Sequence, residues 1–345
     1  MKKINLRNDY CSIAHPLILE AFIEYNKNTY LGYGMDEETN NAIEIIKSKI
    51  NYKDADVFFL PGGTITNKVL ISHILKPYEA VISCESGHIN VHETGTIEQS
   101  GHKILVAPSY EGKIISEDIY KICNTHTDEH MVKPKIVYIS NPTELGTIYT
   151  KEELNKISLA CKDLGLYLYV DGARLATALT SKKNDMNLEE FSKLVDSFYI
   201  GGTKNGLIQG EALVVMNKEL SKDIRYSIKH FGGMYSKGFV NGIQFKTLFE
   251  KDLFNTIGKT QNYLAEELYA KLKQINVKFL FEQETNQIFP IFKNEIVNKL
   301  KDKIEFEIWE KRIDETVIRF VTHYNLTKED INRTIEIIKE VSHDL

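Results

Sequence analysis

The predicted fold rests on two stretches of sequence, Val170-Asp171-Gly172-Ala173-Arg174 and Ile200-Gly201-Gly202-Thr203-Lys204. Each includes the end of an apolar run rich in β-branched and aromatic residues, at 166–170 and 197–200. Runs of this kind are typical of strands that are buried on both faces of a parallel sheet. The carboxyl ends of such strands meet at one edge of the sheet, where α/β folds bind their ligands. We therefore expect Asp171 and Lys204 to lie at one ligand-binding edge.

An acid and a lysine at the ends of two strands are the pair that pyridoxal 5′-phosphate requires. The lysine amine forms a Schiff base with the cofactor, and the carboxylate keeps the pyridine nitrogen protonated so that the ring can accept electrons. We assign these roles to Lys204 and Asp171, and we expect Thr203 to donate to the phosphate or to a nearby carboxylate. A local ion pair between Asp171 and Arg174, and a solvated turn at Lys204, are the simpler alternatives.

Two upstream motifs favour the cofactor site. Gly62, Gly63 and Thr64 lie between a strand-like run and a helical pattern. The glycines permit close approach of the backbone, and Thr64 offers its hydroxyl and amide at a helix N-terminus, which suits a phosphate monoester. A glycine-rich turn with a threonine cap would have the same sequence.

The second upstream motif is His88, which follows an apolar run at 80–83. Its flat imidazole could stack on the cofactor ring and act as an acid or base near neutral pH, although a lone histidine is more often structural. Glu93 could orient a neighbouring group, but we predict the simpler role of capping or solvating a helix.

Strand and helix patterns alternate through the middle of the chain, which indicates an α/β protein with a mostly parallel sheet. Two helical patterns, at 16–27 and 38–50, precede this region. After about residue 245 a long helix, several short strands and a final helix indicate a compact α+β lobe. The strands of the main sheet are predicted at 55–60, 80–84, 103–108, 135–140, 166–171, 197–201 and 212–216.

The composition of the 345 residues excludes several classes of protein. With 42% hydrophobic and 26% charged residues, the chain is ordinary for a soluble globular protein. A net charge of −5 gives no basic field for nucleic acid. No apolar run of signal-peptide or membrane length occurs at the N-terminus, so we predict a cytoplasmic location without membrane association. The four cysteines are scattered and no histidine lies at metal-ligand spacing, so we predict free thiols and no metal site.

On these motifs the chain resembles the threonine aldolase and β-eliminating lyase family of fold-type I pyridoxal-phosphate enzymes. The resemblance extends over nearly the whole chain, and Asp171-Gly172-Ala173-Arg174 is its most specific marker. The others are Arg7-Asn8-Asp9, Gly62-Gly63-Thr64, Ser86-Gly87-His88 with Glu93 and Gly95, Gly202-Thr203-Lys204, and Ile318-Arg319-Phe320-Val321-Thr322.

The patterns along the chain predict three segments. Residues 1–50 form a helical segment, residues 51–245 the large α/β cofactor domain, and residues 246–345 the small α+β domain. The resemblance implies that the first segment packs with the small domain or with a dimer partner. It also implies a homodimer or homotetramer with the active site at the subunit interface.

The resemblance further implies how the substrate is held. Arg174 and Arg319 would bind its α-carboxylate, and Asn8 stands where relatives have a small hydroxyl residue near that group. Thr143 occupies the position of a second histidine that many relatives have near the substrate hydroxyl. Ala212 stands where many aminotransferases of this fold have a phosphate-binding arginine, so we expect Lys229 or Lys237, of the same subunit or of the other subunit of a dimer, to supply that charge.

The implied activity is retro-aldol cleavage of L-threonine or L-allo-threonine to glycine and acetaldehyde. A threonine hydroxyl cannot replace imidazole as a base, so either His88 or a water takes the proton, or the reaction is another one. The enzymatic alternative is β-elimination or racemisation, starting with deprotonation of Cα by Lys204. The last alternative is a non-catalytic protein of the same fold, against which the presence of Lys204, Asp171 and His88 argues.

Overall fold

A mixed sheet lies at the centre of the larger part of the computed structural model, which describes residues 3–343. Within these residues its seven strands are β2 (Asp56–Leu60), β3 (Glu79–Cys84), β4 (Lys103–Ala107), β5 (Lys133–Ser140), β6 (Tyr167–Asp171), β7 (Ser197–Gly201) and β8 (Glu211–Val215). Their order is β2-β8-β7-β6-β5-β3-β4; β8 is antiparallel to both neighbours, and the other pairs are parallel. The predicted mostly parallel sheet is therefore confirmed.

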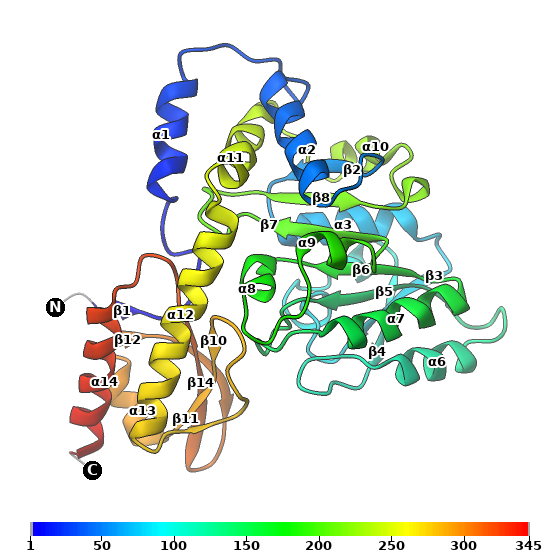
Figure 1. Cartoon of the computed structure of the whole chain (residues 1–345). Coiled ribbons are helices and arrows are strands. Elements are labelled where there is room, and N and C mark those ends of the chain that lie inside the picture. The colour runs from blue at the N-terminus through cyan, green and yellow to red at the C-terminus, as the bar shows by residue number, and fades with distance from the viewer. Residues whose placement is uncertain (1–2, 344–345) are drawn as a thin grey trace.

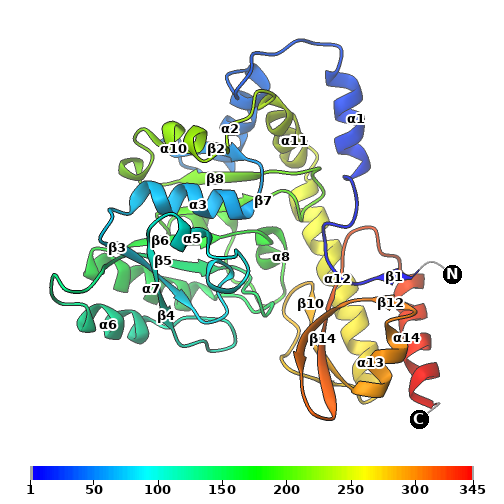
Figure 2. The same ribbon diagram turned by 180° about the vertical axis from the view of Figure 1, so that it is seen from behind.

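Helices cover both faces of this sheet (Figures 1 and 2). One face carries α6 (Ser116–Thr125), α7 (Lys151–Leu164), α8 (Leu175–Leu179) and α9 (Leu188–Ser192), and the other carries α3 (Gly63–Ile74), α5 (Thr96–Gln99) and α10 (Ile224–His230). The short helix α4 (His88–Val91) follows β3, and a 3₁₀ turn lies at Lys218–Leu220. Apolar side chains point to both faces, which is why the strands have nearly continuous hydrophobic sequences. We call this part the sheet body.

Local signals in the sequence set the ends of α7. The Thr150 side chain accepts a hydrogen bond from the Glu153 amide, and the Glu153 carboxylate accepts one from the Thr150 amide. Gly165 ends the helix at φ 65°, a conformation that glycine adopts without steric cost. Both signals are readable in the sequence, and helix α7 begins and ends where they predict.

The C-terminal body is an antiparallel sheet with two helices. Its strands are β9 (Lys278–Phe279), β10 (Gln287–Ile288), β11 (Pro290–Lys293), β13 (Glu307–Lys311) and β14 (Glu315–Val321), and its helices are α13 (Asn294–Leu300) and α14 (Lys328–His343). β14 is central, because β10, β11 and β13 all pair with it. The strand β1 (Ile4–Asn5) pairs in parallel with β12 (Ile304–Glu305), so the start of the chain joins this body.

Helices α2 (Glu37–Lys49) and α11 (Phe239–Glu250) pack against each other on the sheet body, and the long α12 (Leu253–Gln274) runs from that body to the C-terminal body (Figure 1). Helix α12 contributes to both apolar cores: Ile257 belongs to the core of the sheet body, and Leu264 belongs to the core of the C-terminal body. The predicted division at residue 245 stays a prediction. Among the described residues, no helix is long and apolar enough to cross a membrane.

The two helices of the N-terminal segment pack on the sheet body. Helix α1 (Pro16–Tyr25) and α2 both contact α11, and Ile18 and Ile46 join the core of the sheet body. Their apolar faces meet α11, which spans the predicted boundary at residue 245. Packing of the N-terminal segment with the small domain or with a dimer partner stays a prediction.

Candidate active site

The carboxyl edge of the sheet brings together three of the predicted residues. Asp171 ends β6, Lys204 follows β7, and His88 begins α4 just after β3. Their charges influence one another. Burial lowers the pKa of Lys204, and the charge of Asp171 raises it; the same charge raises the pKa of His88. The sequence predicted this grouping from the positions of the strand ends.

Asp171 is almost completely buried and accepts four hydrogen bonds. Its Oδ1 accepts from the Tyr199 hydroxyl (2.5 Å) and the Ala173 amide (3.0 Å), and its Oδ2 accepts from the Tyr138 hydroxyl (2.7 Å) and the Asn67 amide group (3.1 Å). Burial by itself raises the pKa of Asp171, but the nearby His88 and these donors outweigh it and lower the pKa. Asp171 is therefore ionised at neutral pH and can hold a cation.

Burial, together with the positive charge of Arg174, lowers the pKa of Lys204 to about 8. A lysine with such a pKa is partly neutral near physiological pH, and its amine is then a nucleophile for an aldehyde. The Lys204 backbone is also fixed, since its carbonyl accepts a hydrogen bond from Gln261 of α12.

The predicted phosphate loop lies beside Asp171. Helix α3 begins at Gly63, and Gly62 offers no side chain to cap the amides of its first turn. Amides at such a helix start are free to bind an anion. A Cβ atom at Gly63 would lie 2.8 Å from the Tyr199 hydroxyl, which itself donates to Asp171. Glycine at this position therefore lets the loop pass directly over the Asp171 network.

Glu93 is not a helix cap, so the simpler role predicted for it is wrong. Its buried carboxylate accepts hydrogen bonds from His88 Nδ1 (2.8 Å) and Asn67 Nδ2 (2.7 Å), and Asn67 also donates to Asp171. Burial alone lowers the pKa of His88, but the hydrogen bond to Glu93 and the charge of Asp171 outweigh it and raise the pKa. The orienting role that the sequence left open is the one the geometry supports.

Arg174 forms an ion pair, but not with Asp171. Its Nε and Nη2 donate to the two carboxylate oxygens of Asp9 at 2.7 and 3.0 Å, and Asp9 also accepts from Asn286. The alternative pairing of Arg174 with Asp171 is therefore wrong. The sequence placed Asp9 only in a weak N-terminal motif, and no local pattern signalled its partner.

Arg319 is the opposite case, a largely buried guanidinium without an acid. Among the residues that the structure describes, its Nε has no hydrogen-bond partner, and its Nη1 reaches only the Gln287 side chain at 3.4 Å. Its guanidinium lies over the Trp309 ring at 5.6 Å. Burial, with the positive charge of Arg174 nearby, lowers the pKa of Arg319 to about 10. A buried cation is costly without an anion, so Arg319 is suited to bind a ligand carboxylate.

Three other residues predicted for the site, Asn8, Lys229 and Thr143, each make a local contact of their own. Asn8 accepts a hydrogen bond from the Tyr10 amide, Lys229 lies over the Tyr33 ring, and the Thr143 hydroxyl is enclosed in a turn. Their proposed roles stay predictions.

Two acids near this edge were not predicted, the buried Glu211 and the partly exposed Glu144. Glu211 begins β8 and accepts a hydrogen bond from the Gly202 amide (2.8 Å), and burial raises its pKa to about 7. An acid at the start of the apolar run Glu211-Ala212-Leu213-Val214-Val215 was the only signal in the sequence for Glu211. Glu144 follows Thr143 and lies beside His88.

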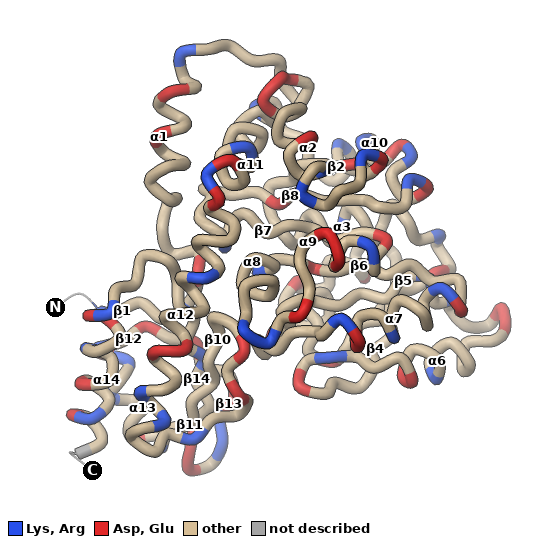
Figure 3. The backbone as a smooth tube through the Cα atoms, viewed as in Figure 1, with Lys and Arg blue, Asp and Glu red and all other residues tan. Residues whose placement is uncertain are grey.

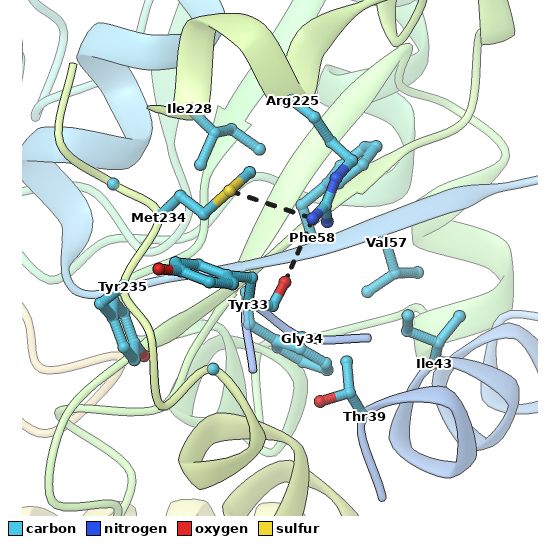
Figure 4. A pocket seen from close by; sticks show the side chains of 13 residues that line it. Tyr33, Gly34, Thr39, Ile43, Val57, Phe58, Arg225, Ile228, Met234 and Tyr235 are labelled. Carbon is cyan, nitrogen blue, oxygen red and sulfur yellow. Dashed lines mark hydrogen bonds between the residues drawn. The ribbon is translucent and has the colours of Figure 1, made fainter. Parts of the chain in front are cut away.

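A separate cavity of about 60 Å³ lies next to β2 (Figure 4). There Arg225 donates to the Tyr33 carbonyl and to Met234 Sδ. This volume holds only a few water molecules. Neither Lys204 nor Asp171 lines it, so it is not the cofactor site.

Comparison with known proteins agrees with this geometry. The model of the β-eliminating lyase family matches residues 5–295. The chain belongs to this family. Similar family members include the low specificity L-threonine aldolases of Pseudomonas aeruginosa, 31% identical over 78% of each chain, and of Escherichia coli K12, 24% identical over 95% of this chain and 96% of the other.

Solved structures show the same fold. The Leishmania major threonine aldolase superposes with a TM-score of 0.96 at 40% identity, covering 98% of this chain and 99% of that one. A Thermus thermophilus aspartate aminotransferase superposes with a TM-score of 0.72 at 12% identity, over 98% and 91%, and shows the fold alone. The predicted fold-type I architecture is confirmed.

Membership of the β-eliminating lyase family implies pyridoxal 5′-phosphate as cofactor, in agreement with the sequence prediction. The residues present fit this molecule. Asp171 supplies an ionised carboxylate for a ring cation, Lys204 a partly neutral amine, and the start of α3 free amides for a phosphate. The site therefore has a donor for each polar part of the cofactor.

Replacing Lys204 by alanine should remove the visible absorbance of the purified protein, because no amine remains to bond the cofactor aldehyde. The absorbance spectrum of the variant, compared with that of the exposed-site control Lys259→Ala, measures this. An unchanged visible band in Lys204→Ala would assign the Schiff base to another lysine.

Glu93→Gln should lower the pKa of His88, because a neutral amide replaces the carboxylate that stabilises the imidazolium. The His88 imidazole then gains its proton only at lower pH, so the inflection of its titration curve should move to lower pH. NMR titration of the imidazole and the pH profile of kcat/KM would both show it. Glu98→Gln, a nearby exposed change, is the control; an identical titration in both variants would contradict the orienting role.

Proposed function

We propose that this chain is a pyridoxal-phosphate-dependent aldehyde lyase that cleaves L-threonine and L-allo-threonine to glycine and acetaldehyde. The observation that supports it most directly is the buried, unpaired guanidinium of Arg319 in the same charged cluster as Lys204 and Asp171. This arrangement suits an α-amino acid bound by its carboxylate. The similarity to enzymes named low specificity L-threonine aldolases favours β-hydroxy amino acids.

Each residue has a role in this proposal. Lys204 would hold the cofactor, Asp171 would hold its ring nitrogen as a cation, and Gly62, Gly63, Thr64 and Thr203 would hold its phosphate. The bound cofactor supplies an electron sink next to the substrate Cα. Arg319, with Arg174 and Asn8, would fix the substrate carboxylate and so the orientation of the bonds at Cα.

His88 would hold or move a proton near the β-hydroxyl. Its Nδ1 is bonded to Glu93, so Nε2 is the ring nitrogen left for the substrate. An imidazole positioned by a carboxylate is a common arrangement for general acid–base catalysis. The Thr143 side chain would contribute less, since its hydroxyl is bonded within its own turn.

A β-eliminating lyase or racemase activity is the second candidate. Its support is the lowered pKa of Lys204, because an amine with a pKa of about 8 can remove a proton from Cα once it is released. The family description is itself that of a β-eliminating lyase. The assay below separates the two.

We further infer a homodimer or homotetramer in the cytoplasm. Helix α1 stands at the edge of the molecule, and exposed apolar residues lie on it and on the segments around it: Ile13, Ile23, Leu31 and Met35. Several exposed apolar residues on one segment are a common feature of protein interfaces. A partner could also bring Lys229 or Lys237 to the phosphate.

The four cysteines are free thiols, as in a reducing compartment. Acidic and basic residues are interspersed along both bodies (Figure 3), which does not favour a nucleic-acid partner.

Incubation of the holoenzyme with L-threonine or L-allo-threonine should yield equal amounts of acetaldehyde and glycine. Both diastereomers should react, with kcat/KM within about tenfold, because no second histidine distinguishes the hydroxyl. Aldehyde, glycine and pyruvate are assayed in parallel, with L-serine as a third substrate. Pyruvate from L-serine without aldehyde from any substrate would favour β-elimination.

Arg319→Ala should weaken amino-acid binding by about 2–4 kcal/mol, because a desolvated charge pair is lost. Absorbance titration of the holoenzyme with glycine measures the loss, and methylamine, which lacks a carboxylate, should bind as before. Arg333→Ala on the exposed face of α14 is the control. Equal glycine affinity in Arg319→Ala and wild type would make the strand arginine structural.

A further inference from the structure

We propose that Glu144, and not Thr143, binds the β-hydroxyl of the substrate by accepting a hydrogen bond from it. This inference rests on the proposed function and identifies the residue that would select β-hydroxy amino acids. Four observations lead to it: the state of Thr143, the half-satisfied carboxylate of Glu144, its position, and its charge.

Thr143 has no proton left to offer. Its hydroxyl is 2.7 Å from that of Thr147, which donates its own proton to the Glu111 carbonyl (2.6 Å). Thr143 must therefore be the donor in the pair. The Leu145 amide approaches the same oxygen, and the side chain is only 1% exposed. The hydroxyl belongs to the internal bonding of this turn and is closed to a substrate.

The next residue, Glu144, has one oxygen bound and one open. Its Oε1 accepts from the Ser140 hydroxyl (2.6 Å) and from the His88 amide (2.9 Å). The side-chain and amide donors of the described residues that reach Glu144 bond Oε1, and Oε2 is not one of the buried polar atoms left without a partner, so it is open to solvent. The two hydrogen bonds hold the carboxyl group in one orientation, so Oε2 is an oriented acceptor that a ligand donor can bond.

The position of Glu144 is that of a group facing the substrate. It lies after β5, the strand next to β6 and Asp171, and it is bonded to the residue whose imidazole would act on the substrate. Glu144 and Asp171 repel each other, and Glu144 and His88 attract each other, so all three groups lie close together. A hydroxyl at the substrate β-carbon would enter between the imidazole and this carboxylate.

The charge of Glu144 makes the hydroxyl a favourable partner. Burial and the charge of Asp171 raise the pKa of Glu144, so its carboxylate is less well solvated than a free one. A hydroxyl donor offsets part of that loss, whereas a methyl group at the same place leaves the oxygen without a partner. Sites that bond a substrate hydroxyl discriminate strongly against the analogue that lacks it.

The test compares L-serine with L-alanine, which differ only by the β-hydroxyl. Dissociation constants are measured by the absorbance change of the holoenzyme on titration, for wild type, Glu144→Gln and Glu144→Ala. We expect wild type to bind L-serine at least about tenfold more tightly than L-alanine. The ratio should fall part of the way to one in Glu144→Gln, because a neutral amide makes a weaker bond than a carboxylate, and close to one in Glu144→Ala.

Glu85→Gln is the matched control. It removes an exposed carboxylate three residues before His88 and should leave the ratio unchanged. Glu144→Gln keeps an oxygen for Ser140 and the His88 amide, so it decides the test if Glu144→Ala fails to fold or to hold cofactor.

A serine-to-alanine ratio in Glu144→Gln within twofold of wild type would overturn the proposal, and so would a ratio near one in the wild-type protein. Loss of the visible band in Glu144→Gln would assign Glu144 to cofactor binding and would also overturn it. The proposed aldolase function fails separately, if wild type produces no aldehyde, because the titration requires no turnover.

Discussion

The buried carboxylate of Asp171 is the group on which the site depends. Tyr138 from β5, Tyr199 from β7 and Asn67 from α3 all donate to it, so three neighbouring elements are fixed around one negative charge. A buried charge is tolerated only when it is fully bonded. The same bonds keep Asp171 ionised and place the start of α3 over Tyr199. The site that suits a cofactor ring and the one that suits its phosphate are therefore parts of one network.

Charge balance explains why two buried arginines differ. Asp9 neutralises Arg174 with two short hydrogen bonds, whereas Arg319 has only the face of the Trp309 ring and a long contact with Gln287. If both arginines had acids, an incoming carboxylate would find no free guanidinium. Burial and the charge of Arg174 lower the pKa of Lys204, whereas the charge of Asp9 raises it. The pairing of Arg174 with Asp9 thus leaves Arg319 as the unpaired cation for the ligand.

The sequence predicted the parts of this site that follow from regular structure. The strand ends at Asp171 and Lys204 were readable because apolar runs mark buried strands, and parallel strands end at one edge. Glu93 and Glu144 were not predictable in the same way. Each acts through a contact between residues that no helix or strand period relates, such as the bond from the His88 amide to Glu144 across 56 positions. A family resemblance pointed to Thr143, and only the hydrogen bonds of its turn show that the neighbouring residue has the open oxygen.

The two bodies must keep a fixed relation for such a site to work, since Arg319 comes from the C-terminal body and Lys204 from the sheet body. Among the links that cross between them, two lie close to the charged groups of the site. Gln261 of α12 donates to the Lys204 carbonyl, and Thr322, three residues after Arg319, donates to the Gln261 carbonyl (2.6 Å). Asp9 bonds Arg174 on one side and Asn286 on the other. Because these links meet the residues next to both charged groups, the distance between the lysine and the unpaired arginine is set by the same contacts that hold the bodies together.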